Sequence, residues 1–272
     1  MAAVPQAITY SASRTRQPAG AQAQWLDDGR LHLHHGPIDL VIGADGPPDA
    51  VRQACFAAID SFGTVLEELV SELALLRTPI HQIGCCPSGR VAVRMWAATI
   101  PHADSCRDAN YVTAMAAVAG AVADEILSVM RDAADLDRIY VNNGGDIALY
   151  LHPAAVTVPH YNVGICADPD VMFWSHDNPD VLAGDRPAKS IPDTFAGTIK
   201  ITAADHIGGI ATSGWRGRSH SLGMADLVTV LAPTAAAADV AATLIANAVW
   251  PNDDNETGWP GIHRQPAHAL AP

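Results

Sequence analysis

The sequence has little positive charge and no long apolar run. Its 272 residues include 16 Lys and Arg against 29 Asp and Glu, a formal net charge of -13. Nucleic-acid binding depends on the neutralisation of phosphates by Lys and Arg, so we expect no nucleic-acid partner. A membrane span needs ~18 to 20 apolar residues, and acidic residues or proline interrupt each candidate run, at Asp124 and Glu125 and at Pro233 and Asp239. We therefore expect no membrane-spanning segment.

Cysteine is also scarce. The chain has five cysteines, and none of them forms a CxxC pair. An odd number of cysteines in a long chain is typical of free thiols in a reducing compartment. The adjacent Cys85 and Cys86 are either redox-active or two ordinary packed thiols. The N-terminus lacks the charged region and apolar run of a signal peptide, so we expect a cytoplasmic protein.

What is present indicates an ordered globular chain, because 49% of the residues are hydrophobic and 17% are charged. Residues 1–21 are small, polar and aperiodic, which predicts a loose N-terminal arm. Residues 22–250 carry the periodic patterns and are long enough to form one domain with a sizeable core. Residues 251–272 are rich in Pro, Asn, Asp and Gly and are expected to form an irregular tail.

Short β runs come first. QWL and LHLHH are separated by Asp27-Asp28-Gly29, which is a strong hairpin signal, and a third run, IDLVIGA, begins at Ile38. His32 and His34 would share one strand face, where they either ligate a metal or alternate on a half-exposed strand.

Two helices and a strand are expected next. Asp49 is predicted to cap a long helix that reaches Leu76, and the alternation from Arg90 to Thr99 predicts a strand. Arg90 and Arg94 would lie on one face, where they hold an anion or face water. The alanine-rich run 111–130 predicts a second helix, in which Gly120 suggests that another helix or a planar ligand approaches the backbone.

Strands dominate the following segment. Residues 138–152 read as strand, turn and strand, with Asn143-Gly144 supplying the positive φ angles and Asp146 near the tip. Further strands are expected at 161–166 and 197–202, with a surface loop at 168–192 between them.

The last patterned stretch, residues 208–249, combines a glycine-rich turn, an apolar strand and an alanine-rich helix. Asp239 and Thr243 are four residues apart and so lie on one face of that helix. A carboxylate and a hydroxyl together suit a hard cation such as Mg²⁺. The alternative is a solvated Asp239 beside a packed Thr243.

Three segments in this order resemble the ApbE-like superfamily, whose founding members are Mg²⁺-dependent FAD:protein FMN transferases. They are VAGAVAD at 118–124, NNGGDIAL at 142–149, and IATSG at 210–214 followed by VTVLAPTAAAADVAATL at 228–244. The whole pattern is most similar to an uncharacterised branch of that superfamily. The resemblance implies an α+β fold, with antiparallel sheets backed by helices in a T-fold-like arrangement.

The resemblance also implies a site. It makes Asp239 and Thr243 the metal-binding pair, and it places an FAD or another flavin or pterin nucleotide against glycine-rich segments whose backbone N–H groups can cradle phosphate. The residues implied to bind this cofactor are Gly120, Asn143, Gly144, Gly145, Asp146, Thr212, Ser213 and Gly214.

Three features depart from the transferase pattern, and one of them is that its N-terminal flavin-stacking segment has no evident match in residues 1–50. Ala119 stands where the transferase motif has Lys, and the segment after Gly214 is shorter. We therefore expect a Mg²⁺-assisted enzyme that acts on a small anionic heterocycle, flavin-like or pterin-like, with Arg216 and Arg218 pairing with the anion and His220 as general acid or base. The alternative is a flavin- or nucleotide-binding accessory module without transfer activity. A homo-oligomer is left open.

Overall fold

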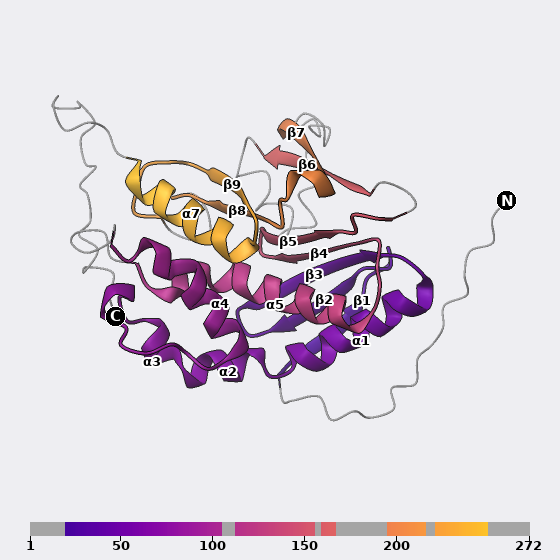
Figure 1. Ribbon diagram of the computed structural model, residues 1–272, viewed down its shortest axis with the longest axis horizontal. Coiled ribbons are helices and arrows are strands. Elements are labelled where there is room, and N and C mark those ends of the chain that lie inside the picture. The colour runs from indigo at the N-terminus through magenta and orange to yellow at the C-terminus, as the bar shows by residue number, and fades with distance from the viewer. Residues whose placement is uncertain (1–19, 105–111, 156–158, 167–194, 216–220, 250–272) are drawn as a thin grey trace, which may run out of the picture.

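The fold is an antiparallel sheet with helices on one face. Figure 1 shows the computed structural model, which describes residues 20–104, 112–155, 159–166, 195–215 and 221–249. The tail from 251 and the predicted loop at 168–192 lie outside these residues. Of the predicted arm at 1–21, only residues 20 and 21 are described. None of the described helices is long and apolar enough to cross a membrane.

Among the described residues, seven strands pair in the order β1-β2-β3-β4-β5-β8-β9, and every neighbouring pair is antiparallel. The α+β class expected from the sequence is therefore confirmed. A separate ribbon consists of β6 and β7. The strands are β1 (Gln22–Trp25), β2 (Leu31–His35), β3 (Ile38–Asp45), β4 (Arg138–Asn143), β5 (Asp146–Leu151), β6 (His160–Cys166), β7 (Phe195–Thr202), β8 (Gly209–Ser213) and β9 (Val228–Ala232).

Alternation along the strands creates two different faces. The helix-side face carries fully buried aliphatic side chains, among them Leu33, Leu40 and Val141. On the opposite face the β6–β7 ribbon packs through Ile201 against Leu149 and neighbouring apolar residues. His32 lies on this second face, half-buried and bonded to Asp39 at 2.9 Å. This contact fits the half-exposed strand rather than a metal ligand.

Helices cover the first face (Figure 1). The core lies between them and the sheet. In chain order the helices are α1 (Pro48–Phe62), α2 (Val65–Ser71), α3 (Leu73–Leu76), α4 (Arg90–Thr99), α5 (Val118–Ala133) and α7 (Ala235–Ala248), with 3-10 turns at Ile80–Gln82, Ile100–His102, Ala114–Ala117 and Ala203–Asp205.

The single long helix expected from Asp49 to Leu76 is wrong. The chain breaks at Gly63 and again at Glu72, which gives α1, α2 and α3. Pro48 opens α1, which suits its fixed φ and missing N–H at the first helical position. Asp49 lies in the first turn and is not the cap. Apolar periodicity was preserved across these breaks because each short helix presents its stripe to the same core.

The strand expected at 90–99 is also wrong, because this segment is helix α4. Its buried side chains include Val91, Ala92, Met95 and Thr99, a spacing that one face of a helix produces. Residues four apart lie on one side of either a strand or a helix. The prediction that Arg90 and Arg94 share a face is therefore right, although the predicted strand is a helix.

The cysteines differ in their burial. Cys55 is buried in α1, whereas Cys85 and Cys86 are both exposed. The buried residue of this loop is Pro87, which follows them. The two adjacent thiols are therefore not packed thiols.

Candidate functional site

The candidate site lies where the end of β4, the start of β5 and the end of β8 meet the first turns of α5 and the middle of α7. The hairpin between β4 and β5 pairs Asn143 with Asp146, so its two turn residues are Gly144 and Gly145. Their φ angles are 64° and 114°, as a tight two-residue turn requires. Asn143 was expected at a positive φ and instead belongs to β4. The Asn142 side chain accepts a bond from the Gly145 N–H at 2.8 Å.

Two polar contacts join this hairpin to its surroundings. Asn143 donates its Nδ2 to the carbonyl of Ala119 at 3.0 Å, which joins the sheet to α5. Asp146 accepts the N–H of Thr212 at 3.3 Å, which joins β5 to β8. The Thr212 hydroxyl itself is exposed and pairs with Thr229. The hairpin and β8 therefore present Asn143 and Asp146 toward the helices.

Helix α7 supplies a buried carboxylate. Only 8% of Asp239 is exposed, which overturns the solvated alternative. One of its oxygens accepts the N–H of Gly120 at 3.0 Å. Thr243, one turn later, lies 3.1 Å from the hydroxyl of Ser213 on β8. The structure thus brings Asp239, Thr243, Ser213 and Gly120 into one locality.

Gly120 has a packing reason as well. A Cβ at this position would clash with the backbone of Ala235, the first residue of α7. Of the two expected neighbours of Gly120, the structure therefore shows the helix. Gly209 on β8 meets Ala235 from another side in the same way. Gly214, at the end of β8, leaves no space for a Cβ against Asp226.

Asp124 completes the α5–α7 junction. Its two carboxylate oxygens accept the N–H groups of Ala235 at 3.0 Å and Ala236 at 2.8 Å. A carboxylate at a helix N-terminus both satisfies free N–H groups and opposes the helix dipole. Thr234 caps the same end locally, through the N–H of Ala237. Asp124 could be identified from the sequence only as part of a motif, because a cap supplied from 111 residues away leaves no local pattern.

Burial shifts the titration of these acids. It raises the pKa of Asp146 to about 7, which the N–H of Thr212 partly opposes. Burial also raises the pKa of Asp239 well above its usual value, and the charge of Asp146 raises it further. Burial raises the pKa of Asp124, while the N–H groups of Ala236 and Ala235 lower it. Three acids whose ionised forms are disfavoured thus surround one junction, a pattern that is enriched at functional sites.

The donor set fits a hard cation better than a soft one. The carboxylates of Asp146 and Asp239 and the hydroxyls of Thr243 and Ser213 are all oxygen donors, which Mg²⁺ prefers. Across the part of the chain that the structure describes, no three His, Cys, Asp or Glu side chains are grouped to hold a metal. Mg²⁺ commonly uses one or two carboxylates and takes its remaining ligands from water and phosphate.

The predicted catalytic side chains are not described. Arg216, Arg218 and His220 lie outside the described residues, which stop at Trp215 and resume at Ser221. Their predicted roles therefore stay predictions.

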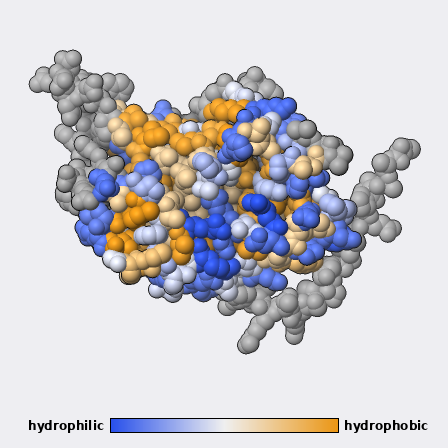
Figure 2. Space-filling view, in the orientation of Figure 1, coloured by the Kyte–Doolittle hydropathy of each residue, from blue (hydrophilic) through white to orange (hydrophobic). Residues whose placement is uncertain are grey.

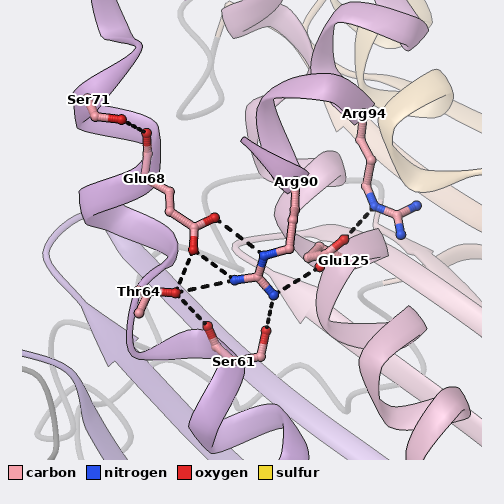
Figure 3. A network of polar contacts seen from close by, with 7 residues as sticks. All are labelled: Ser61, Thr64, Glu68, Ser71, Arg90, Arg94 and Glu125. Atoms are coloured by element: carbon pink, nitrogen blue, oxygen red, sulfur yellow. Dashed lines mark hydrogen bonds and ion pairs between the residues drawn. The ribbon is translucent and has the colours of Figure 1, made fainter. Parts of the chain in front are cut away.

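Arg90 and Arg94 were expected either to hold an anion or to face water. Both bind the carboxylate of Glu125 within the protein (Figure 3). Arg94 binds Glu125 at 2.8 Å, and Arg90 binds Glu125 at 3.3 Å and Glu68 at 3.0 Å. The Glu125 side chain is only 8% exposed. This network joins α2, α4 and α5. The face of the molecule seen in Figure 1 carries hydrophilic and hydrophobic patches side by side (Figure 2). Arg90 and Arg94 therefore have a structural task.

Comparison with known proteins gives a family but no activity. Residues 23–272 match the model of a family described as AbpE bacteria. A UPF0280 protein of Methanothrix thermoacetophila is 34% identical over 143 residues, which are 52% of this chain and 48% of the relative. The chain thus matches about half the length of this relative. Neither description names a ligand or a reaction.

Proposed function

The chain belongs to the AbpE bacteria family, and from that premise we propose that it is a Mg²⁺-assisted enzyme acting on an anionic nucleotide of flavin or pterin type. The observation that carries the proposal is the carboxylate of Asp239, buried among oxygen donors and close enough to Asp146 for their charges to interact. Two ionised carboxylates in a poorly solvated site repel each other, and a bound divalent cation relieves that repulsion.

The neighbouring residues support a cation with phosphate as a co-ligand. Asp239 and Thr243 are the proposed protein ligands, with Asp146 and Ser213 beside them. A bound Mg²⁺ would neutralise phosphate oxygens and orient them. The Gly144–Gly145 turn leaves bare backbone next to Asp146, which lets a phosphorylated ligand approach closely.

The chain's own residues would do three further tasks. The Gly120 N–H holds one oxygen of Asp239 and so fixes its orientation. Asn143 ties the hairpin to α5 and keeps Asp146 in place. Arg216, Arg218 and His220 are proposed to bind the anion and to move a proton, on the strength of their sequence alone.

A second candidate is a binding module without transfer activity. Ala119 occupies the position of the transferase lysine, and its carbonyl is the acceptor for Asn143 beside the carboxylates. The chain therefore offers no ammonium group at the point where the transferase motif has one. Such a module would keep the binding site and release its ligand unchanged.

Thermal unfolding tests both candidates. The purified protein is screened against flavin, pterin and adenine nucleotides, with and without Mg²⁺, alongside Asp239→Asn and the exposed control Asp60→Asn. A ligand at about 100 times its dissociation constant adds ~2.7 kcal/mol. We expect a Mg²⁺-dependent shift with one class in the wild type and in Asp60→Asn, and none in Asp239→Asn.

The outcomes separate the alternatives. An equal shift in Asp239→Asn would remove the cation assignment. Chemical change of the bound nucleotide supports the enzyme, whereas its recovery unchanged after denaturation supports the binding module. No shift with any nucleotide would exclude both candidates for these ligand classes.

A further inference from the structure

The sheet ends in a strand whose outer edge is open. Among the described residues, β9 pairs with β8 on one side and with no strand on the other. Its side chains are half-buried or exposed, whereas Ala211, which lies opposite Val230 on β8, is only 1% exposed. An unpaired edge of this kind offers a row of main-chain N–H and C=O groups to another strand.

Thr229 and Leu231 direct their main-chain groups to this open edge. On β8 the N–H of Thr212 points to β5, and these directions alternate along a strand. Ala211 therefore turns its N–H and C=O toward Val230, and the residues on either side of Val230 turn theirs away from β8. Within the described part of the chain, no main-chain group bonds to these outward groups.

β9 also lacks the features that usually protect an edge. Edges are commonly blocked by charged side chains, by proline or by a β-bulge. The strand reads VTVLA, and its register with β8 is regular along the whole strand. It is therefore suited to pairing with a further strand.

Helix α7 continues the surface above this edge. β9 and α7 lie together at the end of the sheet opposite β1 (Figure 1). Ala238 of α7 packs in one apolar cluster with Val230 and Ala232 of β9. Ile245 lies two turns later on the same face of the helix, since residues seven apart nearly coincide around it, yet 48% of Ile245 is exposed. An apolar side chain thus stands beside the open edge.

This end of the molecule carries no exposed charge. From Leu227 to Val249 the one charged residue is Asp239, which is buried. The whole chain has a net charge of -13, so two copies repel each other over most of their surfaces. They can approach closely along this edge, whereas a partner attracted by charge would bind elsewhere. The occupant that fits best is therefore a second copy of the chain.

We propose that two copies join through β9 about a two-fold axis. Pairing centred on Val230 uses the whole strand, because Thr229 of each copy then pairs with Leu231 of the other and the two sheets become continuous. Ile245 of each copy packs against α7 of the other.

The position of α7 is compatible with this arrangement. The helix lies over both β8 and β9. With strands about 4.8 Å apart, the two copies of α7 would lie about 10 Å apart, which is a usual distance for packed helices. The contact uses none of the residues proposed to bind the cation or the nucleotide, so the two proposals can fail separately.

Sedimentation equilibrium of the full chain over a wide range of concentration measures the association. Thr229→Pro removes an outward N–H and spares the bonds to β8, as proline at an open edge does. Its control, Thr229→Ala, keeps the N–H and removes the hydroxyl that contacts Thr212. Ile245→Lys places a charge on α7, and Val70→Lys is its control at an exposed apolar position on α2.

We expect a reversible dimer for the wild type, Thr229→Ala and Val70→Lys. Thr229→Pro and Ile245→Lys should each weaken association about tenfold or more, as loss of a central interface contact does. The lysine lowers the net negative charge, so added repulsion cannot explain its effect. Higher salt should strengthen the wild-type dimer, because it screens the repulsion between the two acidic copies.

Hydrogen exchange of the wild type locates the contact without any substitution. The amides of Thr229 and Leu231 should exchange more slowly as the protein concentration rises. The amide of Val230 faces β8 in both states, so its exchange should stay slow throughout.

A monomer at every concentration would overturn the proposal. A dimer that Thr229→Pro and Ile245→Lys leave intact would overturn it too, because it would use another surface. Slow exchange of Thr229 and Leu231 in a monomer would mean that another segment of the same chain covers the edge. Weaker association at higher salt would indicate an interface of ion pairs and would equally exclude this one.

Discussion

Helix α5 lies between two buried acids with different neighbours, Glu125 and Asp239. On one side Glu125 is held by Arg90 and Arg94 at 3.3 and 2.8 Å. On the other side Asp239, which is 8% exposed against 6% for Glu125, meets backbone N–H groups and the charge of Asp146. A compensated acid fastens helices together, whereas an acid beside a second acid is held in an unfavourable state. We propose that the second arrangement is the site of a bound cation, which would relieve the repulsion between the two acids.

The geometry of α5 explains the separation. Successive residues are about 100° apart around a helix, and residues four apart share a face. Gly120 and Asp124 therefore both face α7, while Glu125 turns toward α4. Because one helix positions both regions, substitutions in it can break one region and spare the other.

The largest effect is expected for Gly120→Ala. The new Cβ would clash with the backbone of Ala235, which cannot give way as a flexible side chain would. We expect a loss of about 3 kcal/mol or more of unfolding free energy, measured by urea denaturation. Gly84→Ala is the control, since a Cβ there has no neighbour within 4 Å, and it should stay within about 0.5 kcal/mol of the wild type. Equal stability of the two variants would disprove the close helix contact.

A smaller loss is expected on the compensated side. Glu125→Gln removes the charge between Arg90 and Arg94, whose side chains are 43% and 37% exposed and so can recover some hydration. We expect a loss of about 2 kcal/mol, below that of a fully buried pair for this reason. Glu68→Gln breaks a more exposed pair with Arg90 and should cost less than about 1 kcal/mol. Equal costs in urea denaturation would contradict the structural role of Glu125.

Much of the sheet could be predicted from the sequence. The Asp27-Asp28-Gly29 turn and the glycines after Asn143 identify two hairpins, because strand alternation and turn chemistry are local signals. Helix α4 differs from the expected strand because its ten residues are too few to separate the two periods, and packing against neighbouring helices decides between them.

The candidate site was predictable in part. A spacing of four residues put Asp239 and Thr243 together, but their burial and the nearness of Asp146 depend on contacts between segments 93 residues apart, from 146 to 239. The Asp124 cap likewise arises from long-range packing. Residue spacing carries no information on such contacts.

The last predicted effect is a change of stability with pH. It tests whether Asp146, beside Asp239, is costly to ionise. Burial raises the pKa of Asp146 to about 7, from 3.8 for the free side chain. The folded protein thus keeps a proton that the unfolded chain releases, so this contribution to stability is present below about pH 4 and is lost as the pH rises toward 7. Without divalent cations, the wild type should lose about 1 to 2 kcal/mol relative to Asp146→Asn between pH 5 and pH 7.

The measurement is urea denaturation of both proteins at several pH values in the presence of a chelator. Asp60→Asn, an exposed substitution on α1, should follow the wild type at every pH. Addition of Mg²⁺ should raise the stability of the wild type more at pH 7 than at pH 5, because the cation favours the ionised carboxylate. Parallel curves for the wild type and Asp146→Asn would mean that Asp146 is ionised at low cost, and the contrast between the two sides of α5 would then rest on Asp239 alone.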